Sequence, residues 1–305
     1  MEPVQIALYL LQSLLLVSAA VFVVFWGVYA RRSRISAKPS GYQLLVGVIT
    51  DFLDTLGVGS FATTSTFLRV RARPLLGPGI PIADENLPGT LNIGHTLPTI
   101  AQALIYTAII EIDFTTLALM IAASVAGAWF GAGVVSRLPR HKIQIGMGLA
   151  LLLAAAFIGA KLAKGEETNV ALELSGTRLL IGLAGNFVFG ALMTIGVGAY
   201  APIMIMVSLL GMNSKAAFPI MMGSCAFLMP LASVRFINSG RFDARAAVGL
   251  TVGGIPAVLV AAYLVKELPL FYVNILVILV VIYTAATMLY AGVRSPHASP
   301  DEPHR

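Results

Sequence analysis

Residues 179–214 read LLIGLAGNFVFGALMTIGVGAYAPIMIMVSLLGMNS and contain no Lys, Arg, Asp or Glu. These 36 residues exceed the roughly 20 that one helical bilayer crossing needs, but they fall short of two crossings joined by a turn. Gly196 and Gly198 lie near the middle, and Pro202 follows them. A helix that enters the bilayer, breaks at the glycines and returns fits this length best. The stretch therefore predicts a re-entrant hairpin over 179–210.

The same glycine pair occurs once more in the chain. Gly57-Val58-Gly59 lies inside a second long apolar segment, 42–68, which also contains Asp51 and Asp54. Interrupted membrane helices at matching places in two halves of a chain are typical of secondary transporters. We therefore expect a second re-entrant hairpin over 42–68.

The composition is that of a polytopic membrane protein. Hydrophobic residues make up 58% of the chain and charged residues 11%, far from the averages of soluble domains. We expect one membrane domain over residues 1–305, because the gaps between apolar runs, such as 161–178, have the length of loops. The net charge of +6 does not indicate nucleic-acid binding, since the basic residues form short clusters between apolar runs. The only cysteine, Cys225, excludes an internal disulfide.

The basic residues also predict the topology. Residues 4–30 read as an extra first transmembrane helix rather than a signal peptide, because Glu2 stands where a basic start is expected. With Met1 outside and both hairpins re-entrant, 15 of the 20 Lys and Arg residues lie on the cytoplasmic side; the others are Lys161, Lys164, Arg178, Lys215 and Lys266. This predicts a multi-pass protein of the inner (plasma) membrane with a cytoplasmic C-terminus. The full spans expected are 4–30, 89–110, 114–136, 143–160, 216–234, 246–265 and 269–292.

After the first helix, the chain divides into two similar units, 42–160 and 179–292. Each holds a re-entrant hairpin followed by three spans, so the units enter the membrane from opposite sides and form an inverted repeat. The fold class predicted is thus an all-α membrane protein. The shared landmarks are Gly57-Val58-Gly59 with Gly196-Val197-Gly198, Gly94-His95-Thr96 with Gly223-Ser224-Cys225, and Leu138-Pro139 with Leu268-Pro269.

The two helix restarts, near Ser60 and Ala199, are candidates for an anion site. Freed backbone N–H groups and the helix dipole favour negative charge at a helix N-terminus. Small residues and hydroxyls at such places also serve plain helix packing. The candidate substrate-binding residues are Gly57, Val58, Gly59, Ser60, Thr63, Thr64, Gly196, Val197, Gly198, Ala199, Tyr200, Asn92, His95 and Ser224.

Three ionisable residues lie within apolar segments. Asp51 and Asp54 are three residues apart on one helical face, and His95 follows Gly94 in a span that also holds Thr99 and Gln102. Intramembrane ionisable groups are costly and mark ion or proton pathways, so Asp51, Asp54 and His95 are candidates for proton coupling, or for binding a cation. The alternatives are an ion pair with an arginine such as Arg69, or a position in a wet vestibule. No motif supports a metal site here, and no cofactor is expected.

Two longer stretches resemble a known family. Residues 50–62, TDFLDTLGVGSFA, and 88–99, PGTLNIGHTLPT, together with the doubled glycine segments, are similar to the sulfite exporter TauE/SafE family over about residues 42–292. The resemblance implies a transporter that exports sulfite, organosulfonates or other small anions and is driven by the proton-motive force. Members usually carry a proline after the glycines; here Thr63 stands in that place in the first unit, while the second keeps Pro202. Asp51 and Asp54 also depart from the family's apolar pattern.

The sequence therefore predicts a secondary transporter of small sulfur-containing anions that works by alternating access, with protons as the coupling ion. A passive anion channel and a transporter of another small organic anion are the alternatives. An enzyme is not expected, since the chain has no H-E-x-x-H, G-x-S-x-G or cysteine motif.

Overall fold

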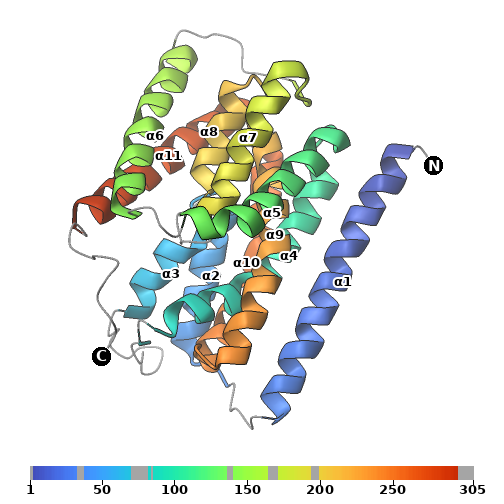
Figure 1. Ribbon diagram of the computed structural model, residues 1–305, viewed down its shortest axis with the longest axis vertical. Coiled ribbons are helices and arrows are strands. Elements are labelled where there is room, and N and C mark those ends of the chain that lie inside the picture. The colour runs from blue at the N-terminus through green and yellow to red at the C-terminus, as the bar shows by residue number, and fades with distance from the viewer. Residues whose placement is uncertain are drawn as a thin grey trace.

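A computed structural model describes residues 3–32, 38–69, 82–83, 85–135, 140–163, 171–193 and 199–294. Throughout these residues the regular structure is helical (Figure 1). The helices are α1 (Pro3–Arg32), α2 (Gly41–Thr55), α3 (Ser60–Arg69), α4 (Leu87–Ile109), α5 (Phe114–Val135), α6 (Arg140–Ala163), α7 (Gly176–Met193), α8 (Tyr200–Leu209), α9 (Ala217–Ser239), α10 (Ala244–Glu267) and α11 (Leu270–Arg294), with a 3-10 turn, η1 (Ser214–Ala216), before α9.

Six helices of the described chain are long and apolar enough to cross a bilayer: Val4–Arg32, His141–Ala160, Gly176–Met193, Ser214–Ser239, Ala244–Glu267 and Leu270–Val293. The protein is therefore a multi-span, all-helical membrane protein. Five of the six cover predicted spans. The sixth is α7, which the sequence predicted to be a hairpin arm. Helices α4 and α5 cover the remaining predicted spans; α4 carries many polar side chains, and the apolar part of α5 is Phe114–Phe130.

The glycine pair in the first unit interrupts a helix. Helix α2 ends at Thr55 and α3 begins at Ser60. Gly57 has φ +94° and Gly59 φ +85°, a region of backbone space that glycine occupies without the steric penalty other residues meet. In the second unit α7 ends at Met193 and α8 begins at Tyr200. Residues 194–198, which include Gly196, Val197 and Gly198, lie outside the described residues.

In each interrupted pair the far ends of the two helices lie together. The Tyr42 hydroxyl near the start of α2 donates to the Phe67 carbonyl near the end of α3, at 2.8 Å. The Asn213 N–H just after α8 donates to the Ala171 carbonyl ahead of α7, also at 2.8 Å. Figure 1 shows α2 and α3 toward one end of the long axis and α7 and α8 toward the other. Each pair thus starts and finishes at its own end of the molecule.

Helices from the two units pack against each other reciprocally. The most extensive contacts pair α2 with α10, α5 with α7, α4 with α9, and α6 with α11. Glycines permit the close approaches: a Cβ at Gly47 would lie 2.7 Å from the Leu250 carbonyl oxygen of α10, and a Cβ at Gly190 would overlap the backbone of Ser124 in α5. Interlocking of the two units therefore builds the core.

Helix α1 stands to one side of this core (Figure 1). It contacts α9 and α4 and buries Leu15 and Phe22, whereas most of its other large apolar side chains are exposed. In a bilayer such a surface faces lipid.

We predict that Gly47→Ala destabilises the protein and that Gly27→Ala does not. The added methyl at position 47 meets the α10 backbone, whereas a Cβ at Gly27 has no atom within 4 Å. Overpacking of this kind costs about 1–3 kcal/mol. Thermal unfolding of both variants in detergent measures the difference, and equal melting temperatures would show that α2 and α10 are not in close contact.

Candidate functional site

A carboxylate, an imidazole and a hydroxyl form a buried chain between α2, α4 and α3. Asp51 Oδ1 lies 2.7 Å from His95 Nδ1, and His95 Nε2 lies 2.9 Å from Thr64 Oγ1. All three side chains are fully buried. The first distance is typical of a charge-assisted hydrogen bond. The pairing of Asp51 with His95 that the sequence suggested is thus present as a contact.

Thr64 allows this chain to accept either charge state of His95. When the imidazole is neutral and donates from Nδ1 to Asp51, Nε2 accepts a hydrogen bond from the Thr64 hydroxyl. When the imidazole is protonated, Nε2 donates to the same oxygen, because a hydroxyl is both donor and acceptor. A proton can therefore be gained or lost here without any rearrangement of heavy atoms, as a proton relay requires.

The Asp54 side chain caps the N-terminus of α3. Its Oδ1 accepts a hydrogen bond of 2.5 Å from the backbone N–H of Ser60, and its Oδ2 accepts one of 3.0 Å from Gln102 Nε2. The N-terminus of α3, expected to be free for a ligand, thus already holds a negative charge from the chain itself. A carboxylate is the group that a helix N-terminus favours.

The Asp54 carboxylate is fixed by further bonds. Gln102 Nε2 also donates to Thr55 Oγ1 at 2.9 Å, and the Tyr106 hydroxyl donates to the Thr55 carbonyl at 2.7 Å. Among the side chains that the structure describes, no Lys or Arg lies within ion-pair distance of Asp51 or Asp54. The side chain of Arg69, an expected partner, lies outside that set. Across the described ranges, no group of three His, Cys, Asp or Glu residues is arranged to hold a metal ion.

The proline in α4 is accommodated by the second unit. Pro98 cannot donate to the Gly94 carbonyl, four residues earlier. Thr251 of α10 supplies the missing donor, its hydroxyl lying 2.7 Å from that oxygen. Gly94 itself packs against Leu250 of α10, so the two units hold α4, and with it His95, in place.

The start of α8 is buried but has no side-chain cap. Ala199, the N-cap residue, offers no acceptor; Ala199 is 2% and Tyr200 9% exposed. Buried helix termini normally have such partners, so this N-terminus is suited to an anionic ligand. Helix α8 packs close to the first break: a Cβ at Gly57 would lie 2.8 Å from the Met204 sulfur, in the second turn of α8. The Tyr200 side chain hydrogen-bonds with Cys225 of α9.

Several expected ligand residues instead bond within their own helix. Thr63 Oγ1 donates to the Ser60 carbonyl, Asn92 Nδ2 to the Pro88 carbonyl and Ser224 Oγ to the Ile220 carbonyl. These three side chains are engaged by ordinary helix hydrogen bonds. Val58 is half-buried against the main core, and the residues around Gly196–Gly198 are not described.

Sequence reasoning missed Tyr106 and Thr55, and it named Gln102 only as a neighbour of His95. A signal was present. His95, Thr99, Gln102 and Tyr106 are spaced by four, three and four residues, which places them on one face of α4. A polar stripe of this kind on a membrane helix predicts a face turned toward the protein interior.

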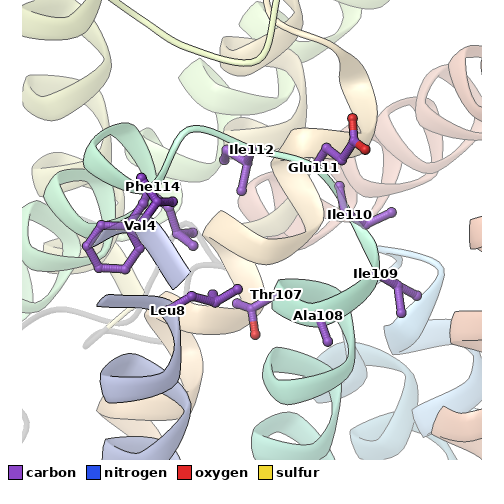
Figure 2. Close-up of a pocket in the computed structure, with 10 residues that line it drawn as sticks. Val4, Leu8, Thr107, Ala108, Ile109, Ile110, Glu111, Ile112 and Phe114 are labelled. Carbon is purple, nitrogen blue, oxygen red and sulfur yellow. The ribbon is translucent and has the colours of Figure 1, made fainter. Parts of the chain in front are cut away.

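A separate cavity of about 290 Å³ opens between the start of α1 and the α4–α5 connection (Figure 2). Its lining includes Val4, Leu8 and Phe114, and Figure 2 shows the Glu111 carboxylate pointing away from Val4 and Leu8. It shares no residue with the Asp51–His95 chain, and nothing in its lining assigns it a role.

Comparison of the chain with models of protein families, with characterised proteins and with solved structures finds no match.

We predict that Asp54→Ala destabilises the protein more than Asp54→Asn. Asparagine keeps an oxygen for the Ser60 N–H, whereas alanine leaves that donor unpaired and removes one of the two acceptors of Gln102 Nε2, at a cost of about 1–3 kcal/mol. Chemical denaturation in detergent micelles at neutral pH gives both values. If the two variants lose the same stability, Asp54 does not hold the start of α3 through its oxygens.

Proposed function

We propose that this protein is a proton-coupled secondary transporter, an exporter of small sulfur-containing anions such as sulfite or organosulfonates, similar to the TauE/SafE family. The observation that carries the proposal is the interruption between α2 and α3, which lies beside a buried carboxylate–imidazole–hydroxyl chain. Irregular backbone within a bilayer is tolerated where it is buried in protein or lines a wet cavity. Intramembrane ionisable residues next to such a break mark an ion or proton pathway.

The reciprocal packing supports an inverted repeat of two units, 42–160 and 179–292. Helix α2, the first of its unit, packs on α10, the fourth helix of the other unit. In the same way α7, the first helix of the second unit, packs on α5, the fourth of the first unit. The contacts also agree residue by residue. Gly94 meets Leu250 and its counterpart Gly223 meets Ile121. A two-fold relation exchanges these pairs, and transporters built from inverted repeats bind substrate where the repeats meet.

The end-to-end contacts support re-entrant hairpins. Helix α8 has ten residues, about 15 Å of helix, which is half of a hydrocarbon core of about 30 Å. Helix α3 has the same length. Because each pair starts and finishes at its own end of the molecule, the proposal has neither pair crossing the membrane.

We place the anion at the uncapped start of α8, facing Asp54. There the backbone N–H groups are its hydrogen-bond donors, since the Tyr200 side chain already hydrogen-bonds with Cys225. A negative charge beside the Asp54 carboxylate is unfavourable in a medium of low dielectric constant. Proton uptake by the Asp51–His95–Asp54 group removes that repulsion and proton release restores it, so proton binding and anion binding are linked. This linkage is what a coupled transporter requires.

The basic residues orient the protein in the proposal, with α1 beginning outside and the C-terminus in the cytoplasm of a cell with the protein in its plasma membrane. A passive anion channel is the second candidate, because facing hairpins also occur in channels. Accumulation of anion against its gradient in proteoliposomes separates the two, since only a transporter achieves it. Another small organic anion remains an alternative substrate, and the same assay compares it directly with sulfite.

We predict that Asp51→Asn abolishes the dependence of anion flux on a pH gradient while anion binding is kept. The amide retains a hydrogen bond with His95 but cannot take up a proton. Flux into proteoliposomes is measured with and without a pH gradient, and binding by thermal stabilisation with the same anion. If the flux of the variant depends on the pH gradient as in the wild type, Asp51 has no role in coupling.

We also predict that Gly59→Leu and Gly198→Leu stop flux while the protein still inserts. A leucine at position 59 is strained at φ +85°, by about 1–2 kcal/mol, and places bulk at the break. Gly146→Leu in α6 is the matched control, because a Cβ there has no atom within 4 Å. Flux is compared at equal amounts of folded protein. Normal flux in both glycine variants would refute a site between the two breaks.

A further inference from the structure

Three oxygen atoms beside the Asp51–His95 pair have no hydrogen-bond partner among the described residues. They are Asp51 Oδ2, Thr99 Oγ1 and Gln102 Oε1, on side chains that are 0%, 1% and 0% exposed. Leaving a polar atom unpaired in a buried position is costly, most of all for a carboxylate. The three together therefore indicate that something binds between them.

The hydrogen bonds already described bring the three side chains to neighbouring stretches of α2 and α4. Asp51 is held by His95 of α4, and one turn along α2 Asp54 is held by Gln102 of α4. Thr99 lies between His95 and Gln102 in sequence and on the same face of α4. Asp51 Oδ2 itself lies beside Gly254 of α10 and Pro98 of α4, next to Thr99 in the sequence.

Thr99 differs from the other buried threonines of the described residues because its hydroxyl has no hydrogen-bond partner; Thr63, Thr64, Thr116 and Thr251 have partners. The hydroxyls of Thr50, Thr55, Thr90, Thr96 and Thr107 each donate to the carbonyl four residues earlier in their own helix. Thr99 makes no such bond. Its hydroxyl is thus available to a bound molecule.

The donors and acceptors of the three groups identify the molecule. Gln102 cannot be turned over, because its nitrogen already has two acceptors, Asp54 Oδ2 and Thr55 Oγ1. Its oxygen and Asp51 Oδ2 both need a donor, while the Thr99 hydroxyl can donate. Water offers two donors and accepts as well. The negatively charged oxygens of a sulfite or sulfonate group offer no donor and would lie against the Asp51 carboxylate, so this is not the site of the substrate's anionic group.

We propose that Asp51, Thr99 and Gln102 hold a water molecule, through which the coupling proton enters Asp51. A hydronium at this position transfers one proton to Asp51 Oδ2, which leaves water and a neutral carboxyl; Oδ1 keeps its hydrogen bond to His95. Thr99 and Gln102 are positioning residues. The water site depends on the three oxygens alone, whereas its role in coupling rests on the proposed function.

The ionisable groups near Asp51 come from three helices. Asp54 lies on the same helix, His95 on α4 and Tyr200 on α8. Helix α10 contributes Gly254, against which Asp51 Oδ2 packs and which has no side chain. No group on α10 therefore replaces the bound water as a proton donor to this oxygen.

The test compares Thr99→Val, which removes only the hydroxyl, with Thr107→Val, whose hydroxyl bonds to its own helix. Infrared difference spectra are recorded between low and high pH without substrate, and the Asp51 carboxyl band is assigned with Asp51→Asn. In Thr99→Val we expect this band to move to higher wavenumber and the water band sensitive to H₂¹⁸O to disappear. Thr107→Val keeps both bands, and Thr99→Ser restores them.

Unchanged bands in Thr99→Val would overturn the water site. A carboxyl band of the wild type that moves when Na⁺ replaces choline would also overturn it, because the three oxygens would then bind a cation. These spectra need no transport, so they stand even if no anion is moved. In proteoliposomes, Thr99→Val should lower pH-driven accumulation roughly tenfold, the worth of one hydrogen bond to a charged group. Unchanged accumulation with altered spectra would overturn only the role in coupling.

Discussion

Lipid cannot hydrogen-bond to a peptide group, and this constraint governs the structure. In the proposed re-entrant hairpin, the helix that stops at Thr55 and resumes at Ser60 leaves N–H and C=O groups that only the protein can satisfy. Asp54 provides an acceptor for the first N–H of α3, and Gln102, Thr55 and Tyr106 hold that acceptor in place. A buried carboxylate needs hydrogen-bond donors around it. Helix α4 supplies one from its polar face, Gln102, so this face of α4 serves the break between α2 and α3.

The N-terminus of the helix after each interruption is capped differently in the two units. In the first, the restarted helix is closed by a side chain of the chain itself. In the second, the restart at Tyr200 follows an alanine that cannot cap it. The facing helices also differ: Asp51 Oδ2 packs against Gly254 of α10, whereas Gly190 of α7 packs against the backbone of Ser124 in α5. In the proposed mechanism the two units therefore have different roles: the first binds the proton at Asp51, Asp54 and His95, and the second binds the anion at the start of α8.

The sequence alone predicted those features that depend on a residue's own conformational or solvation preference. The glycines placed the first interruption because few other residues adopt positive φ there. Asp51 and His95 were recognised because ionisable side chains are costly within apolar segments. Asp54 as the cap of α3 was not foreseen, since capping depends on how the chain turns between Thr55 and Ser60. Thr63, Asn92 and Ser224 were overvalued: hydroxyls and amides in membrane helices often bond to their own backbone. Tyr106 was missed because tertiary packing brings it to Thr55, although its helical spacing from His95 gave the face.

The most direct test concerns the side of the membrane on which each interrupted pair ends. The chain has a single cysteine, so a Cys225→Ser background allows single cysteines at Lys38, Glu85, Ala171 and Lys215 to be labelled with an impermeant maleimide in vesicles of both orientations. Re-entrant pairs predict that Lys38 and Glu85 positions react from one side, and Ala171 and Lys215 positions from the other. Labelling of Lys38 and Glu85 from opposite sides would mean that α2–α3 crosses the bilayer, and it would contradict the account.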